Sequence, residues 1–228
     1  MPGDERCLGW RGSWSDERPL SVAGARKGIL GGTFNPPHVA HLIVAQEVRE
    51  SLVLDEIVLI PSHIHALKGQ ASAAPRHRAA MTELAVAGDP GLSMDRIEIQ
   101  RGGTSYTVDT LRALREREPY TAWSLILGRD NLEELDQWRE AEALPELARV
   151  VVTTRAGLEP PARLPFGGRC TLVPVPALDL SSTVIRSRIA AGRSIRYWVP
   201  PAVEAYIREH DLYSSVPARS IDNATPSG

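Results

Sequence analysis

The chain has 228 residues, of which 43% are hydrophobic and 24% are charged, and its formal net charge is −2. These values are typical of a globular protein that is long enough to bury a substantial core. The near-neutral charge gives no electrostatic reason to expect a nucleic acid or an anionic membrane as a partner. No apolar stretch approaches the roughly 18–20 residues that a membrane-spanning helix needs.

The cysteines indicate the compartment of the protein, and the composition of the two ends indicates where its folded domain begins and ends. Only Cys7 and Cys170 are present, and neither stands in a metal-binding or redox spacing, so a reducing compartment, the cytoplasm, is expected. Residues 1–26 are polar and lack the apolar block of a secretory signal, which predicts a disordered N-terminal extension. Residues 214–228 are similar and are expected to form a flexible tail. Residues 27–213 remain as a single domain.

Short β-branched runs alternate with helical patterns through this domain. Strands are predicted at 27–32, 56–62, 95–100, 122–128, 149–155 and 171–176. Helices are predicted at 38–52, 75–87, 106–118, 131–144, 182–191 and 201–210. This alternation predicts an α/β fold of the Rossmann-like, doubly wound kind, a mostly parallel sheet with helices on both faces. Such sheets bind ligands beyond the carboxyl ends of their strands, so the loops that follow strands matter most.

The first such loop reads GGTFNPPHVAH, residues 31–41. Gly31 and Gly32 let backbone N–H groups approach a ligand, and the helix that begins a few residues later offers unpaired N–H donors to a phosphate. His38 and His41 are three apart, so they share one face of the first turn and can point at the same anion. Either histidine alone would be read as structural. A zinc site is disfavoured, because no third ligand follows at a suitable spacing.

A second anion site is predicted where the last strand leads into LDLSSTVIRSRI, residues 178–189. Ser181 or Ser182 suits the N-cap of the helix, and hydroxyl groups, free N–H groups and Arg186 would converge on its first turn. An arginine on a helix is usually only solvated, but this combination is much less ordinary. Two anion sites from distant segments suit a nucleoside triphosphate and a second substrate.

Both segments resemble signatures of the nucleotidylyltransferases, which join a nucleotide to a phosphate-bearing partner and release pyrophosphate. Residues 31–41 are similar to G-G-T-F-[DN]-P-x-H-x-[GA]-H, and residues 180–186 to [IL]-S-S-T-x-I-R. Within this family, RGGTSYTVDTL (101–111) and LILGRDNLEELDQW (125–138) resemble the branch that acts on nicotinate mononucleotide. The resemblance implies adenylyl transfer from ATP to nicotinate mononucleotide, giving deamido-NAD and pyrophosphate, in NAD biosynthesis.

The resemblance also implies roles for the matching residues. Catalysis would fall to His38, His41 and Arg186. ATP would be bound by Gly31, Gly32, Thr33, Phe34, His41, Gly128, Asp130, Ser182, Thr183 and Arg186. The mononucleotide would be bound by Lys68, Thr104, Ser105, Tyr106 and Trp138, with Trp138 stacking on the pyridine ring. From the residues alone, Trp138 reads equally well as a core aromatic in a helix, and Tyr106 as a packing residue at a helix start.

The sequence departs from the family pattern in one loop and is compatible with two alternative functions. Residues 61–68 read PSHIHALK where many relatives have Pro-Pro-His-Lys. A mononucleotide-binding role is therefore expected only for Lys68, and no role is assigned to His63 or His65. Mg²⁺ is expected to enter with ATP, no dedicated metal-binding residues are assigned, and a homo-oligomer remains open. The alternatives are a sister enzyme that uses another phosphate, such as nicotinamide mononucleotide or phosphopantetheine, and a nucleotide-binding regulator without catalysis.

Overall fold

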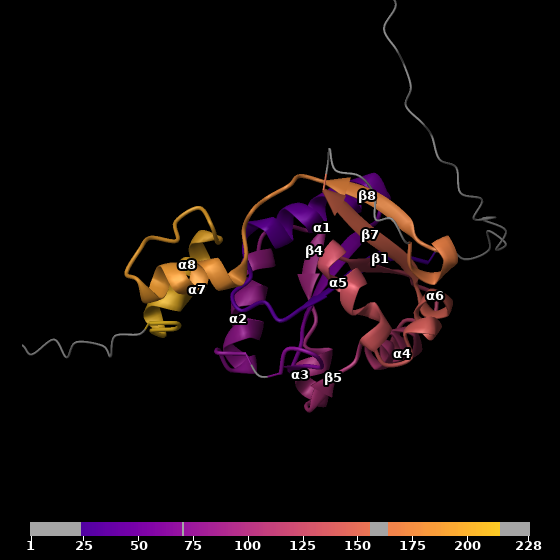
Figure 1. Cartoon of the computed structure of the whole chain (residues 1–228), viewed down its shortest axis with the longest axis horizontal. Coiled ribbons are helices and arrows are strands. Elements are labelled where there is room, and N and C mark those ends of the chain that lie inside the picture. The colour runs from indigo at the N-terminus through magenta and orange to yellow at the C-terminus, as the bar shows by residue number, and fades with distance from the viewer. Residues whose placement is uncertain (1–23, 70, 156–163, 215–228) are drawn as a thin grey trace, which may run out of the picture.

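The computed structural model describes residues 24–69, 71–155 and 164–214 (Figure 1). The extension expected at 1–26 lies outside the described residues as far as residue 23, and the tail lies outside them from residue 215 onwards. The first strand already begins at Arg26.

A six-stranded sheet in the order β4-β2-β1-β6-β7-β8 forms the centre of the molecule. Its strands are β1 (Arg26–Gly32), β2 (Glu56–Pro61), β4 (Leu92–Met94), β6 (Ala122–Leu127), β7 (Arg149–Arg155) and β8 (Thr171–Val175). Every neighbouring pair is parallel, so all the carboxyl ends lie along one edge. The order runs outward from β1 in both directions, which places the topological switch point between β1 and β6. The predicted doubly wound α/β fold is confirmed.

Helices cover both faces of this sheet because residues along each strand alternate between the faces. Ile29 belongs to a buried cluster with α4 (Thr107–Arg117) and α6 (Leu144–Leu147). Leu30, on the opposite face, packs with α1 (Val39–Ser51) and with the end of α2 (Pro75–Val86). Figure 1 shows α1 and α2 toward one side of the sheet and α4 and α6 toward the other.

The C-terminal helices form a third apolar cluster with α2. They are α7 (Ser182–Ala190) and α8 (Pro201–Glu209), and Ile185, Val203 and Ile207 are buried against residues of α2. Figure 1 shows both helices beside α2 at one end of the molecule. The segment between α7 and α8 reaches the start of α1, where the backbone N–H of Val39 donates to the backbone oxygen of Trp198 at 3.0 Å. No helix in the described ranges is both long and apolar enough to cross a bilayer.

The strand predicted at 95–100 is wrong. The strand there is β4, and it ends at Met94, while α3 (Ile97–Arg101) occupies most of the predicted segment. The alternation of Ile97 and Ile99 suggested a strand, but Glu98 between them is the buried side chain, and its carboxylate accepts a hydrogen bond from Thr110 at 2.7 Å. A tertiary hydrogen bond has overridden the local pattern.

The helix predicted over 131–144 is also wrong in part. The segment divides into α5 (Arg129–Glu134) and two 3-10 turns, η1 (Leu135–Gln137) and η2 (Ala141–Ala143). Trp138 has extended backbone and Glu140 is left-handed with φ 50°, so the helix cannot continue through them. A third 3-10 segment, η3, spans Pro165–Gly168.

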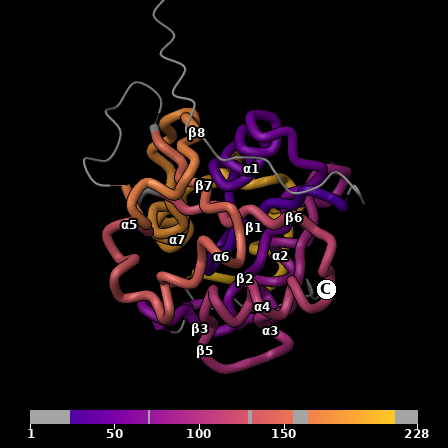
Figure 2. Tube along the Cα trace, turned by 90° about the vertical axis from the view of Figure 1, so that its right-hand side faces the viewer, coloured from indigo at the N-terminus to yellow at the C-terminus, as the bar shows by residue number. Residues whose placement is uncertain are grey.

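A two-stranded parallel ladder, β3 (Ile64–His65) with β5 (Thr104–Ser105), lies outside the main sheet. Figure 2 places β3, β5 and α3 together at one end of the molecule, with β8 at the other. The ladder joins the loop after β2 to the segment that the sequence predicts to meet the pyridine ring.

Candidate active site

The two glycines after β1 have different surroundings. A Cβ atom on Gly31 would have no heavy atom within 4 Å, whereas a Cβ on Gly32 would lie 3.2 Å from Cζ of Phe34. Phe34 is 2% exposed and has left-handed backbone with φ 47°, so its ring fills the space under the loop. Gly31 is therefore the position whose small size keeps open space at the end of β1.

His38 and His41 form one stacked pair at the start of α1. Their ring centroids are 3.7 Å apart, the edge of the Phe34 ring contacts His41, and the N-cap residue of the helix is His38. The backbone N–H of His38 donates to Nδ1 of His41 at 3.1 Å. Because Nδ1 accepts this bond, a neutral His41 carries its proton on Nε2, which is then available as a donor to a ligand.

Burial sets the charge of this pair. It lowers the pKa of His38 to about 4, and burial together with the nearby His38 lowers the pKa of His41 well below its usual value. At neutral pH both imidazoles are therefore uncharged N–H donors. His38 is 5% exposed, and its Nδ1 atom is buried without a partner among the described residues. A buried polar atom of this kind is rare in folded proteins and fits a site that completes its hydrogen bonds with a ligand.

The second phosphate motif contacts the first one directly. The hydroxyl of Ser182 donates to the backbone oxygen of Pro36 at 2.8 Å, and Nη1 of Arg186 donates to the backbone oxygen of Asn35 at 2.8 Å. Nη2 of Arg186 also lies 3.2 Å from the hydroxyl of Thr183. The helix start itself is capped by the preceding serine, whose Oγ accepts a backbone N–H at 3.3 Å. Two segments that are far apart in the sequence thus form one wall.

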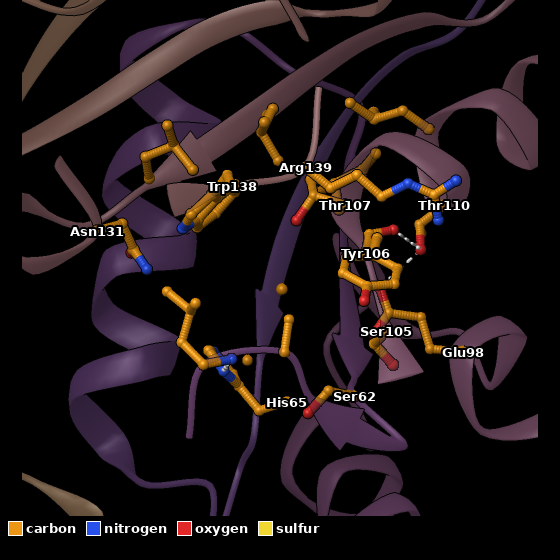
Figure 3. A pocket seen from close by; sticks show the side chains of 18 of the residues that line it. Ser62, His65, Glu98, Ser105, Tyr106, Thr107, Thr110, Asn131, Trp138 and Arg139 are labelled. Atoms are coloured by element: carbon orange, nitrogen blue, oxygen red, sulfur yellow. Dashed lines mark hydrogen bonds between the residues drawn. The ribbon is translucent and has the colours of Figure 1, made fainter. Parts of the chain in front are cut away.

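A cavity of about 370 Å³ lies at the carboxyl ends of β1 and β6 (Figure 3). Five of the predicted site residues line it: Gly31, Gly32, Ser105, Tyr106 and Trp138. The predicted phosphate-binding residues His38, His41, Ser182, Thr183 and Arg186 do not line it, and neither do Thr33, Phe34, Lys68, Thr104 and Gly128. The polar residues that line it without having been predicted are Ser62, His65, Glu98, Thr107, Thr110, Asn131, Gln137 and Arg139.

The two aromatic residues of the cavity face each other across it. Figure 3 shows Trp138 on one side and Tyr106 on the other. Trp138 does not lie inside a helix, because it follows η1 with extended backbone. Tyr106 is the N-cap residue of α4, and the guanidinium of Arg139 lies 4.9 Å from its ring centroid. Two aromatic side chains on opposite sides of one cavity suit a planar aromatic ligand.

The loop that carries Tyr106 is held in place by the β3–β5 ladder and the hydrogen bonds next to it. The hydroxyl of Ser105 accepts the backbone N–H of His63 at 3.0 Å, and Nδ1 of His63 lies 3.0 Å from the backbone oxygen of Gly103. Glu98 lies behind this loop, and burial raises the pKa of its carboxyl group. The segment 103–106 is therefore fixed to the loop that follows β2.

His65 lines the cavity although it was not assigned a role from the sequence. Its Nδ1 accepts the backbone N–H groups of Leu67 and Lys68, each at 3.2 Å. Burial, followed by the charge of Lys68, lowers the pKa of His65. A neutral His65 with Nδ1 occupied carries its proton on Nε2, so it too can donate to a ligand. The only signal in the sequence was its place after a strand.

Arg78 is a second residue that the sequence did not single out. It is 1% exposed, and its guanidinium donates to three backbone oxygens, those of Thr33 at 2.8 Å, His63 at 2.7 Å and Ala73 at 3.2 Å. These oxygens belong to three loops around the carboxyl ends of β1 and β2. On the printed sequence Arg78 looks like any charged residue near a helix start.

The remaining predicted residues lie at the end of β6. The backbone N–H of Gly128 donates to Oδ1 of Asn131 at 3.0 Å, and Gly128 is the N-cap residue of α5. The side chain of Asp130 lies outside the described part of the structure. Among the described residues, no group of three or more His, Cys, Asp or Glu side chains is placed to hold a metal ion.

Comparison with known proteins identifies the family through a family model and through sequence relatives. A model of the Cytidylyltransferase-like family matches residues 29–188. The probable nicotinate-nucleotide adenylyltransferase of Herpetosiphon aurantiacus is 43% identical over 194 residues, covering 82% of this chain and 98% of the relative. The protein of the same name from Salinibacter ruber is 44% identical over 188 residues, covering 82% and 96%.

The fold agrees with a solved structure as well. Nicotinic acid mononucleotide adenylyltransferase of Plasmodium falciparum, complexed with NaAD, superposes with a TM-score of 0.69 at 20% identity, over 83% of this chain and 97% of that one. This likeness shows that the two proteins share a fold. The chain belongs to the Cytidylyltransferase-like family of nucleotidyltransferases and, within it, to the nicotinate-nucleotide adenylyltransferases.

Proposed function

We propose that the protein transfers the adenylyl group of ATP to nicotinate mononucleotide, giving deamido-NAD and pyrophosphate in NAD biosynthesis. The observation that carries this proposal is the contact of Arg186 and Ser182 with the backbone oxygens of Asn35 and Pro36. It brings a guanidinium and a helix N-terminus to the loop that holds the stacked histidines. Such a group of donors suits a triphosphate.

On the ATP side, we assign the phosphates to the two motifs. His38 and His41 would donate to the α- and β-phosphates, and Ser182, Thr183 and Arg186 would hold the outer phosphates. The backbone of residues 31–34 would lie against the triphosphate, and Gly128 and Asp130 against the ribose. The neutral state of His41 supports a role as hydrogen-bond donor rather than as a fixed positive charge.

On the acceptor side, we assign the pyridine ring to the space between Trp138 and Tyr106. Gly31 and Gly32 line this same cavity, so the ring and the triphosphate would meet at the end of β1. Segment 104–106 would supply the N–H and hydroxyl donors that a ring carboxylate needs. Lys68 would act at the mononucleotide phosphate only if its loop moved toward the cavity, since it does not line the cavity here.

The reaction requires positioning and charge stabilisation more than a strong base. An oxygen of the mononucleotide phosphate is already anionic and attacks the α-phosphorus of ATP in line. A new P–O bond forms as the bond from the α-phosphorus to the oxygen that bridges to the β-phosphate breaks, and pyrophosphate leaves with that electron pair. The histidines and Arg186 would offset the repulsion between the two anions and the charge that develops on the α-phosphoryl oxygens.

The divalent cation would enter the site as part of the nucleotide substrate. The side chains at the two motifs are imidazole N–H groups, hydroxyls and a guanidinium, which bind anions rather than cations. Mg²⁺ would therefore enter bound to the phosphate oxygens of ATP and to water, which is its common mode with nucleotides.

The test is a substrate panel in which pyrophosphate release is measured. We expect turnover with ATP and nicotinate mononucleotide, and a kcat/KM at least tenfold lower with nicotinamide mononucleotide, because the ring carboxylate is the group the pocket would recognise. Phosphopantetheine and glycerol phosphate serve as further acceptors, and CTP as the alternative nucleotide. Faster turnover with any of these would reassign the substrate, and no turnover with any would favour a nucleotide-binding regulator.

A further inference from the structure

Asn35 lies where the two phosphate motifs meet, and both the nitrogen and the oxygen of its side-chain amide form hydrogen bonds. It is 6% exposed. Its Nδ2 donates to the hydroxyl of Ser72 at 3.0 Å, and its Oδ1 accepts the backbone N–H of Ala73 at 3.3 Å and the hydroxyl of Tyr213 at 2.8 Å. Its own backbone oxygen is the acceptor for Arg186. The position of Asn35 therefore helps to set where the Arg186 guanidinium is held, together with the contact between Nη2 and the Thr183 hydroxyl.

Tyr213 reaches Asn35 from a position 178 residues further along the chain. It follows α8, whose residues Val203 and Ile207 are buried against α2. The backbone of Tyr213 is left-handed with φ 69°, a conformation that costs free energy for a bulky residue and persists only where surrounding contacts hold it. The N–H of Leu212 donates to the backbone oxygen of Ile207 at 3.0 Å and fastens the turn just before it.

The hydroxyl of Tyr213 is kept in its donating form. Burial raises the pKa of Tyr213, against the opposing effect of Arg186 and Arg78, whose charges both act on it. The phenol therefore stays protonated across the working range of pH and can donate to Oδ1 of Asn35.

We propose that Tyr213 is a positioning residue for the adenylyl transfer proposed above: it fixes Asn35, and through Asn35 the Arg186 guanidinium, in the geometry that the triphosphate needs. Tyr213 does not line the cavity, so no contact with the mononucleotide is assigned to it. The C-terminal end of the described chain is thereby part of the catalytic arrangement rather than packing alone.

The test compares Tyr213→Phe with Tyr206→Phe. Both substitutions remove one hydroxyl from the same C-terminal region, and the Tyr206 hydroxyl has a comparable bond, 3.0 Å from Nδ1 of His77. We expect Tyr213→Phe to lower kcat about tenfold with little change in the KM for nicotinate mononucleotide, because misplacing a catalytic group mainly affects the transition state. We expect Tyr206→Phe to leave kcat within about twofold. The two melting temperatures should fall by similar amounts.

A double substitution separates positioning from a general loss of structure. If Tyr213 acts through Asn35, adding Tyr213→Phe to Asn35→Ala lowers kcat no further. Equal kcat values for the two phenylalanine variants, or full additivity with Asn35→Ala, would overturn the proposal. If the wild-type protein turned over no substrate, the proposed function would fail, and the positioning role would be tested by calorimetric titration with ATP instead. Tyr213→Phe should then weaken ATP binding several-fold. Equal ATP affinities in the two phenylalanine variants would refute the positioning role.

Discussion

Nη1 of Arg186 lies 2.8 Å from the backbone oxygen of Asn35, a residue 151 positions earlier in the chain. This bond joins the helix after the last strand to the loop after the first. It holds the guanidinium at the loop that leads into the stacked histidines, and in the proposed function the two motifs act as one site. Most of the expected effects of substitution follow from this relationship.

Substitution of Arg186 should be far more damaging than substitution of its neighbour on the same helix. We expect Arg186→Gln to lower kcat by roughly a hundredfold or more, the usual effect of losing one charged donor to a developing anion. Arg188→Gln is the matched control, because Arg188 donates to the backbone oxygen of Ser194 at 2.9 Å and lies over Trp198. Steady-state kinetics on both variants measures the difference, and similar losses in the two would contradict the assignment.

Removal of the His41 imidazole should separate catalysis from folding. We expect His41→Ala to keep the far-ultraviolet circular dichroism of the wild type while turnover falls by at least about a hundredfold. His77→Ala serves as the control, since His77 pairs with Tyr206 of α8 and belongs to neither phosphate motif. Near-normal turnover in His41→Ala would remove this histidine from the mechanism.

The buried histidine pair should make the protein sensitive to acid. The pKa of His38 is lowered to about 4 in the folded state, so the unfolded chain binds more protons between pH 6.5 and 4. Stability that is fully present above pH 6.5 is therefore lost as the pH falls through this window. For His38 alone the loss at pH 5 is about 2 kcal/mol.

Urea denaturation at pH 7 and pH 5 measures this loss. The wild-type protein should lose about 2 kcal/mol more stability between the two values than His38→Gln does. Glu98 acts in the opposite direction, because burial raises the pKa of its carboxyl group, and it is present in both proteins. An equal pH response in wild type and variant would mean that His38 is not buried in its neutral form.

Two glycines of β1 should respond differently to the same substitution. A Cβ on Gly31 meets open space at the cavity, whereas a Cβ on Gly28 would lie 2.4 Å from Cδ1 of Ile57 in the core. We expect Gly31→Ala to keep its melting temperature but to lose at least about tenfold in kcat/KM, since the methyl group occupies substrate space.

Gly28→Ala should show the reverse pattern. Overpacking of this kind typically costs about 1–3 kcal/mol, so we expect a lower melting temperature with kcat/KM close to normal in the protein that remains folded. Thermal unfolding and kinetics on both variants test the pair. A Gly31→Ala protein with full activity would show that the end of β1 does not touch the substrates.

Much of the fold could be predicted from the sequence, because parallel strands that are buried on both faces form short β-branched runs between amphipathic helices. The failures occurred where tertiary contacts decide the local structure. Glu98 is buried by its bond with Thr110, which turns an alternating pattern into helix. The left-handed backbone of Glu140 ends a helical pattern just after Trp138.

Candidate site residues could be proposed from the sequence where neighbouring residues carry the chemistry, as in the segments around His41 and Arg186. The supports of the site could not. The bond between Tyr213 and Asn35 spans 178 residues, and Arg78 acts through backbone oxygens that any residue supplies. A single sequence contains no local pattern for contacts of this kind. The residues that hold the motifs together became visible only in the folded chain.

The most direct measurement is the structure of the protein with a non-hydrolysable ATP analogue whose α,β-bridging oxygen is replaced by carbon. We expect one triphosphate group to lie within hydrogen-bond distance of both Nε2 of His41 and the guanidinium of Arg186. A triphosphate bound to only one of these residues, or in a different part of the molecule, would contradict the shared site on which the proposed reaction depends.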